Sequence, residues 1–437
     1  MTLPFARVPA VAARLASLYS ENPAEFSFVG LFWSFWVTLA LFPIGYGWRE
    51  VMPPVCLLFL LLYYRHAWAF TVLARLRVFP LFCCFWGMLL IGVLGSQQPF
   101  NSLLHAGTCI NKGFILPFIA MECVREEKDL RRLVWACVFA CFWQGMDGVW
   151  QAYSGRDFIM GYPLSAGRLT GSIGDYPVGN YIALALIPAA ACWFILREQF
   201  GRMASALLLT ALLWPACFLL LGAAARSGML ALAAAAGLWW WFVRGGASAL
   251  RRFFPAFAAA SVLLVLFFAL TPRKGVLTPG FIAGDGRWKL WELAWRVFCE
   301  HPWFGAGAGQ YNAAFRALGL APAPPDPITM SHPHNIYLDM LYAHGLVGFI
   351  PGMIFLFGFL LWGYRRIRPG LLAEWEGRVG GLYWRLAAAF WVGYAGWLVN
   401  GIFGHDFYRT WWLALAMSYL GILIGAAVNG TRPPPAR

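Results

Sequence analysis

Long apolar runs recur along the chain, separated by short polar segments that are rich in arginine. A bilayer core about 30 Å thick needs roughly 20 apolar residues per helix, and runs of that kind recur from Phe28 to Ala427. The runs are continuous and lack the alternation of a membrane-barrel strand. The pattern predicts an all-α polytopic membrane protein with about 12 transmembrane helices, forming a single membrane domain over residues 1–437.

The predicted spans cover residues 28–45, 50–64, 78–95, 103–121, 131–150, 178–196, 204–222, 227–243, 253–271, 336–363, 384–404 and 410–427. The second and eighth spans are short for a full crossing, so the number of transmembrane helices could differ from 12 by one or two. The composition agrees with this class, because 61% of the residues are hydrophobic and only 12% are charged.

Basic residues collect in alternate connections, and arginine and lysine near helix ends are retained on the cytoplasmic side. The connections that contain Arg75, Arg125 and Arg366 therefore share one side, which we assign to the cytoplasm together with both termini. The net charge of +14 follows from these short loops and does not indicate nucleic-acid binding. We expect no cleaved signal peptide, because the first residues lack a compact apolar core with a cleavage site.

Two outer connections are long enough to form structure of their own. One covers residues 151–177, and the other is a large periplasmic loop over residues 271–335. The second contains an amphipathic stretch from Arg287 to His301 with aromatic residues at helical intervals, which predicts a helix on the membrane surface. We expect the chemistry to lie between these loops and the helix ends beneath them.

His334 and Asn335 mark the point where the large loop enters a membrane span. An imidazole with an ordinary pKa near 6.5 can accept a proton from a sugar hydroxyl at neutral pH, and a nearby arginine or lysine would keep it neutral. In the alternative interpretation, His334 caps the span and His332 is a polar loop residue. The residues alone do not decide between these hypotheses.

A smaller set of eleven basic residues falls on the predicted outer side, and several of them occur where topology alone disfavours them, among them Arg168, Arg226 and Arg287. A guanidinium group binds phosphate oxygens in bidentate fashion and stays charged in a poorly hydrated site. Together the three side chains would hold a lipid diphosphate. The alternative is that each extends to lipid headgroups or pairs with a carboxylate such as Asp175 or Asp285.

The sequence lacks the signatures of common cofactors. It has no phosphate-binding Gly-x-x-x-x-Gly-Lys loop, and no strand precedes the Gly305–Gly309 run, which is more typical of a close-packing turn. Most of the ten cysteines fall in apolar spans without zinc-ligand spacing. We therefore expect no cofactor, no metal and no nucleic-acid partner. Lys112 lies inside a predicted span, and its role is open.

Several motifs resemble those of one family. His334-Asn335, followed after nine residues by Gly345-Leu-Val-Gly348, is similar to the His-Asn-(x9)-Gly-x-x-Gly signature of bacterial O-antigen ligases. The blocks 287–295 and 301–311 resemble the outer loop of that superfamily. Arg226-Ser-Gly-Met-Leu230 and Arg168-Leu-Thr-Gly171 resemble two of its arginine sites. The resemblance extends from Arg168 to Ile350.

The resemblance implies a multi-spanning GT-C glycosyltransferase of the bacterial inner membrane with its active site on the periplasmic face. It would transfer a polysaccharide from undecaprenyl diphosphate to lipid A–core oligosaccharide by a metal-independent, inverting mechanism. By the same resemblance His334 is the catalytic base, and Arg226, Arg287 and Arg168 bind the diphosphate. Asn335 and His332 would support the site, although His332 competes with His334 for the role of base.

The motifs are also compatible with related functions. An O-antigen polymerase of the same superfamily would extend the lipid-linked chain, and a protein O-oligosaccharyltransferase would glycosylate a serine or threonine. A lipid or polysaccharide transporter is the alternative of a different class, and it would be expected to place charged residues near the membrane midplane. The acceptor sugar, the glycan length and the oligomeric state are not predicted.

Overall fold

The computed structural model describes residues 19–44, 46–109, 114–174, 178–244, 287–317, 332–408 and 410–430, together with Ser17 and Gly319. Within these ranges the chain forms helices and no strand, apart from two isolated β-bridges near Arg168. The all-α prediction is confirmed for this part of the chain.

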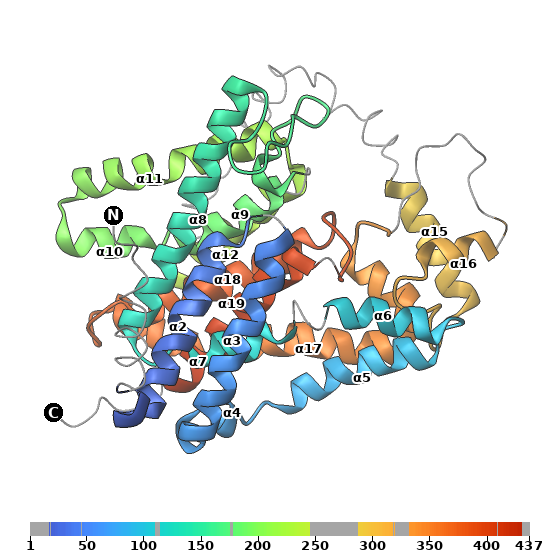
Figure 1. Cartoon of the computed structure of the whole chain (residues 1–437), viewed down its shortest axis with the longest axis horizontal. Coiled ribbons are helices and arrows are strands. Elements are labelled where there is room, and N and C mark those ends of the chain that lie inside the picture. The colour runs from blue at the N-terminus through green and yellow to red at the C-terminus, as the bar shows by residue number, and fades with distance from the viewer. Residues whose placement is uncertain are drawn as a thin grey trace, which may run out of the picture.

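The helices are arranged as one elongated bundle with a smaller helical group at one end (Figure 1). They are α2 (Pro23–Leu41), α3 (Tyr46–Ala67), α4 (Val72–Arg75), α5 (Pro80–Leu94), α6 (Pro99–Cys109), α7 (Leu116–Glu122), α8 (Glu127–Ser154), α9 (Val178–Ala189), α10 (Cys192–Gln199), α11 (Arg202–Ala223), α12 (Arg226–Arg244), α15 (Arg287–Glu300), α16 (Tyr311–Ala317), α17 (Ile336–Trp375), α18 (Tyr383–Asn400) and α19 (Thr410–Asn429).

Seven helical segments of the described residues are long and apolar enough to cross a membrane, and each overlaps a predicted span. They are Pro23–Leu41, Glu50–Arg75, Glu127–Ser154, Val178–Gln199, Arg202–Ala223, Ile336–Trp375 and Trp412–Asn429. Helices α5, α12 and α18 occupy three further predicted spans. The predicted span 103–121 is divided between α6 and α7, and the one at 253–271 lies outside the described residues. The total of 12 stays a prediction.

Helix α19 forms the centre of the bundle, since 94% of its apolar span is buried within the protein. Its glycines explain how it packs against α7: a Cβ atom on Gly421 or Gly425 would collide with the backbone carbonyl of Pro117 or Met121. Small residues allow two helix backbones to approach closely, and in a membrane such van der Waals packing drives association. Helix α18 lies beside α19 and is buried over most of its length.

Connections predicted to share one side of the membrane meet at one end of the bundle. Arg75 Nη2 donates a hydrogen bond to Asn429 Oδ1 (2.8 Å), and Asn429 Nδ2 donates to the Val124 carbonyl oxygen (2.5 Å). Arg125 forms an ion pair of 2.6 Å with Glu25. These contacts bring together the ends of α2, α4, α7 and α19. The grouping agrees with the predicted alternation of arginine-rich connections, and its cytoplasmic orientation stays a prediction.

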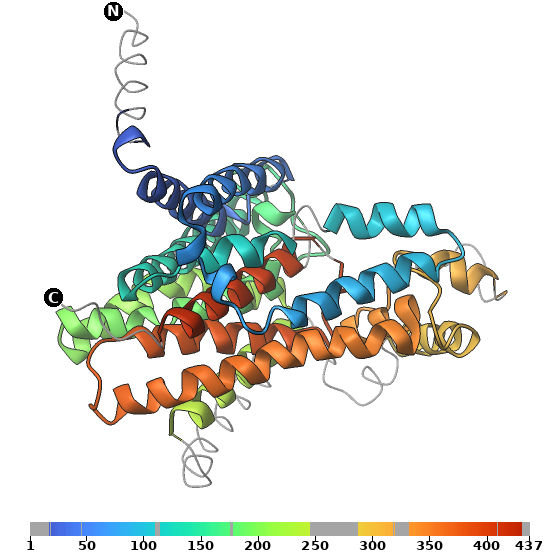
Figure 2. The ribbon, with the colours of Figure 1, turned by 90° about the horizontal axis from the view of Figure 1, so that it is seen from below.

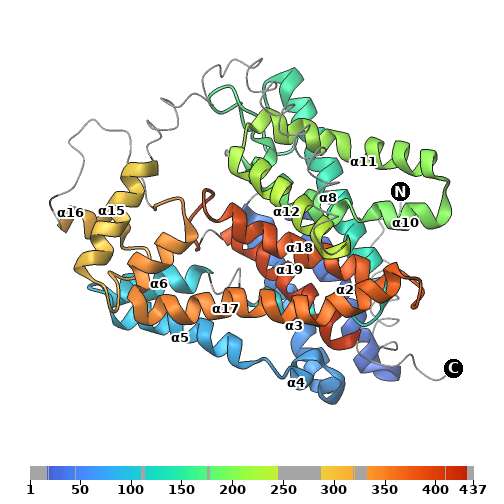
Figure 3. The same cartoon turned by 180° about the vertical axis from the view of Figure 1, so that it is seen from behind.

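At the other end, α17 is broken at Gly345, whose backbone has φ 57° and ψ −171°. Four backbone hydrogen bonds of 2.8–3.0 Å join residues 342–347 to residues 302–307, so the loop after α15 supplies the partners that the broken helix lacks. A Cβ atom on Gly345 would collide with the backbone of Trp303. Helices α15, α16 and α6 are thereby held at the start of α17 (Figure 3), while α5 runs along it (Figure 2).

The glycine-rich run 305–309 is a close-packing turn, as the sequence predicts. Gly305, Gly307 and Gly309 have φ values of 74°, 105° and 71°, a region that L side chains rarely adopt. A Cβ atom on Gly305 would collide with the backbone of Ala343 in α17. The glycines therefore allow the loop to lie directly on the broken helix.

Candidate active site at the start of helix α17

His334 lies in the short loop before α17 with a left-handed backbone, φ 55°. Such a conformation is uncommon outside glycine, and histidine is among the residues that tolerate it. Its Nδ1 is 3.2 Å from the carbonyl oxygen of Gly404, in the loop between α18 and α19. Because a carbonyl oxygen only accepts, Nδ1 carries the hydrogen and Nε2 is left as the basic nitrogen.

Asn335 is the N-cap of α17. Its Oδ1 accepts hydrogen bonds from the backbone N–H groups of Tyr337 (2.9 Å) and Leu338 (3.0 Å), which the first turn of a helix leaves unsatisfied. The next residue, Ile336, donates its N–H to the Gly401 carbonyl at 2.9 Å. The alternative in which His334 caps this helix is therefore wrong, and Asn335 instead fixes the backbone beside His334.

Three histidines gather at this point, namely His332, His334 and His405. The His332 and His334 ring centroids are 4.2 Å apart, and His405 lies 6.1 and 5.9 Å from them. His332 and His405 are buried, with 7% and 8% of their surface exposed. His405 is not among the site residues that the sequence motifs predict. The available signal was Gly404-His405-Asp406, a polar segment between the last two apolar spans.

The three histidines could also supply ligands to a metal ion. One ring nitrogen from each lies within 4.8 Å of the others. Zinc–nitrogen bonds are about 2.1 Å long, so two nitrogens bound to one zinc ion are at most roughly 4.2 Å apart. This limit is tighter than the 4.8 Å within which the three ring nitrogens lie. The positive charge of Arg287 acts on the same site and opposes a bound cation. The absence of a resident metal stays a prediction.

The electrostatics of the site favour a neutral His334. Burial is the main reason that the pKa of His334 is lowered from its ordinary 6.5 to about 4. His332 and the Arg287 charge lower the pKa as well, whereas the hydrogen bond to Gly404 and the Asp406 charge raise it. Arg287 therefore has the effect expected of a nearby arginine, since its charge lowers the pKa of His334. At pH 7 the ring is in the form that accepts a proton.

Arg287 is brought to the site by α15, the amphipathic helix predicted from the aromatic spacing. This helix buries Leu290 and Val297 in a small core with the start of α17. One turn after Arg287, Trp291 Nε1 donates a hydrogen bond to the carbonyl oxygen of Pro333, between the two loop histidines (3.0 Å). The helix that begins with Arg287 is thus attached directly to the histidine loop.

Arg226 begins α12, and a buried polar chain connects its neighbour Ser227 to the end of α18. Ser227 Oγ donates to Asn180 Oδ1 on α9 at 2.9 Å, and Asn400 Nδ2 donates to the same oxygen at 3.4 Å. Asn400 is the last residue of α18, and the loop that follows it carries the carbonyl bonded to His334. The start of α12 and the histidine loop therefore adjoin the same group of helix ends.

Arg168 lies in the loop after α8, in a tight turn with Ser165. Their backbones exchange hydrogen bonds of 3.0 and 3.1 Å. The following residue, Leu169, donates its N–H to the Gly222 carbonyl at 3.2 Å, four residues before Arg226. The structure thus brings the Arg168 loop close to the start of α12. Arg287, by contrast, acts on His334 directly through its charge.

The fold and the site define an integral membrane protein with a histidine cluster and arginines at one end of its helices. Residues 210–351 match the O-antigen ligase family, over a segment that contains Arg226, Arg287, His332, His334 and Asn335. The match confirms the resemblance seen in the motifs. Arg168 lies upstream of the match. No curated protein sequence matches the chain.

Proposed function

We propose that the protein is an O-antigen ligase that transfers a polysaccharide from undecaprenyl diphosphate to lipid A–core oligosaccharide in lipopolysaccharide biosynthesis. The observation that carries the proposal is the basic Nε2 of a neutral His334 beside Arg287, within the segment that matches the family. The site would lie on the periplasmic face of the bacterial inner membrane, with both termini in the cytoplasm. The grouping of the arginine-rich connections at the opposite end supports this orientation.

The reaction is a single displacement at the anomeric carbon of the donor sugar. A hydroxyl oxygen of the acceptor forms the new bond to this carbon, and its proton passes to Nε2 of His334. The bond from the anomeric carbon to the diphosphate oxygen breaks, and the oxygen leaves with the electron pair. Attack opposite the leaving group inverts the configuration of the sugar.

Donor binding would adjust the basicity of His334. With a pKa of about 4 the ring is neutral but only weakly basic, and an efficient base has a pKa nearer the working pH. A bound diphosphate places negative charge beside the ring and raises its pKa, in the same direction as Asp406. The base is then strongest when the donor is in place.

The arginines would bind the diphosphate and stabilise it as it leaves. Negative charge grows on the departing oxygen, and fixed guanidinium groups stabilise that charge without a cation. The support for this role is most direct for Arg287, because its charge acts on His334. Arg226 is supported by the polar chain that starts at its neighbour Ser227. Arg168 is supported by the hydrogen bond that attaches its loop near the start of α12.

The related enzymes use the same donor and differ in the acceptor. A polymerase would join the polysaccharide to another lipid-linked chain, and a protein O-oligosaccharyltransferase would transfer it to a serine or threonine. For a transporter, charged groups are expected near the midplane between repeated halves. The cluster of histidines and arginines lies instead at helix ends, which supports an enzyme.

Reconstitution tests the proposal. The purified protein in proteoliposomes is supplied with undecaprenyl-diphosphate polysaccharide and lipid A–core, without metal or nucleotide. We expect a product in which the polysaccharide is attached to the core with inverted anomeric configuration, as shown by mass spectrometry and nuclear magnetic resonance. A longer lipid-linked chain would identify a polymerase, a glycosylated protein acceptor an oligosaccharyltransferase, and flux without a new glycosidic bond a transporter.

A further inference from the structure

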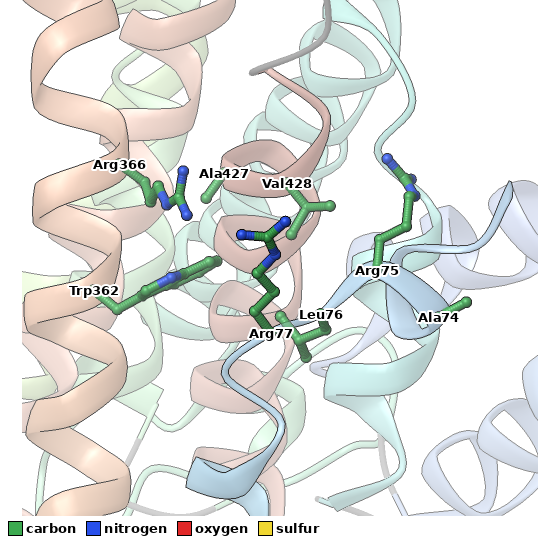
Figure 4. A pocket seen from close by; sticks show the side chains of 8 residues that line it. All are labelled: Ala74, Arg75, Leu76, Arg77, Trp362, Arg366, Ala427 and Val428. Carbon is green, nitrogen blue, oxygen red and sulfur yellow. The ribbon is translucent and has the colours of Figure 1, made fainter. Parts of the chain in front are cut away.

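A second site lies between α4, α17 and α19, in a pocket of about 670 Å³ (Figure 4). Three arginines line it, Arg75, Arg77 and Arg366, together with the Trp362 ring and small or aliphatic residues. None of the described residues that line it carries a carboxylate. Figure 4 shows the guanidinium groups of Arg77, in the turn after α4, and of Arg366, on α17, approaching the same space. The pocket therefore carries concentrated positive charge next to an aromatic surface.

The arginines of the pocket differ from several others at this end of the bundle. Arg125 forms an ion pair with Glu25, and Arg131 forms one with Glu198. Arg77 and Arg366 are exposed, and no carboxylate within the described ranges pairs with either side chain. An anion from outside the chain is the partner that such groups favour.

Arg75 is held rigidly at the edge of the pocket. Its Nε donates to the Thr71 carbonyl at 2.9 Å, and its Nη2 donates to Asn429 Oδ1 at 2.8 Å. These bonds connect the end of α4 to the end of α19. The charge of Arg75 is thus fixed in position before any ligand binds, which lowers the entropic cost of binding.

The pocket lies on the opposite membrane surface from the histidine cluster. Trp412, near the start of α19, packs against His405 with ring centroids 5.1 Å apart. Val428, on the pocket wall, follows in the same helix about 24 Å further along its axis. That length approaches the roughly 30 Å thickness of a bilayer core. The pocket is therefore at headgroup level in the other leaflet.

We propose that this pocket binds the phosphate group of an anionic phospholipid from the leaflet facing away from the histidine cluster. Guanidinium groups bind phosphate oxygens in bidentate fashion, and basic pockets between membrane helices take anionic headgroups. The Trp362 ring provides an apolar face for the glycerol and upper acyl chain, as interfacial tryptophans do. The site is separate from the proposed transferase chemistry and does not depend on it.

The test compares lipid binding by the full-length protein and two matched double variants. Arg77→Gln with Arg366→Gln removes two charges from the pocket. Arg65→Gln with Arg365→Gln removes two exposed arginines from α3 and α17 that do not line the pocket. Each purified protein is offered phosphatidylglycerol against phosphatidylcholine, and bound lipid is quantified by native mass spectrometry. Inorganic phosphate is added in a separate arm.

We expect the wild type and the control variant to retain phosphatidylglycerol in preference to phosphatidylcholine. The pocket variant should lose this preference by about tenfold or more, since charged hydrogen bonds are removed. Equal preference in both double variants would overturn the proposal, because it would indicate a general response to surface charge. Binding of inorganic phosphate in the pocket without retention of phosphatidylglycerol would overturn the assignment to a lipid.

Discussion

Nδ1 of His334 and the carbonyl oxygen of Gly404 lie 3.2 Å apart, and this contact decides which ring nitrogen is free to act as a base. The bond joins the loop before α17 to the loop before α19, so segments that are distant in sequence orient the ring. The cost of a left-handed backbone at His334 is then balanced by tertiary contacts. This relationship leads to the first prediction.

We expect His334→Asn to fold and to lose transfer activity. Asparagine tolerates a left-handed backbone but has no basic nitrogen, so the variant separates chemistry from stability. Loss of a general base typically lowers the rate about 10²- to 10⁴-fold. Transfer to lipid A–core is measured alongside thermal unfolding. His301→Ala, which removes an imidazole outside the cluster, should remain active; a fully active His334→Asn would exclude this residue as the base.

The second prediction concerns the pH dependence of kcat/KM for the donor. The base must be unprotonated to act, and the pKa of His334 is lowered to about 4, so protonation inactivates half of the enzyme at about that pH. We expect kcat/KM to be constant from neutral pH to about pH 5 and to fall as the pH approaches 4. In kcat the acidic limb should lie at higher pH, because the bound diphosphate raises the pKa. An acidic limb of kcat/KM centred near 6.5 would contradict a buried base.

Much of the fold was predictable because its signals are local. The apolar runs that form α2, α8 and α11 are continuous in sequence, and the aromatic spacing of α15 gives its amphipathic face directly. The left-handed His334 and the break at Gly345 were not foreseen. Both depend on partners far along the chain, Gly404 in one case and the loop around Trp303 in the other.

The candidate site was predictable in part for the same reason. His334, Asn335 and Arg287 belong to recognisable motifs, and the structure places them at adjoining helix ends. His405 belongs to none of those motifs and reaches the cluster only because α18 and α19 fold back on α17. Sequence periodicity gives the direction of a side chain within one helix but not which loops meet at its end.

A third prediction concerns Arg287. Replacement by alanine removes a charge that acts on His334 and, in the proposed mechanism, a bidentate contact with the diphosphate. We expect kcat/KM for the donor to fall about 10- to 100-fold, with only partial recovery in Arg287→Lys because lysine lacks the planar fork. Arg296→Gln is the matched control, since this exposed arginine of α15 pairs with Glu292. Equal losses in Arg287→Ala and Arg296→Gln would indicate that α15 tolerates no charge change.

The last prediction uses the histidine cluster to separate a resident metal from an adventitious one. Because the proposed mechanism needs no cation, prolonged dialysis against a chelator should leave transfer unchanged. Excess Zn²⁺ should inhibit, since a zinc ion held by His332, His334 and His405 would take a ring nitrogen of His334 and disturb the base. Chelator added afterwards should restore the rate, and His405→Ala should raise the half-inhibitory zinc concentration about tenfold or more. Activity lost on dialysis and recovered with stoichiometric zinc would instead make the metal part of the enzyme.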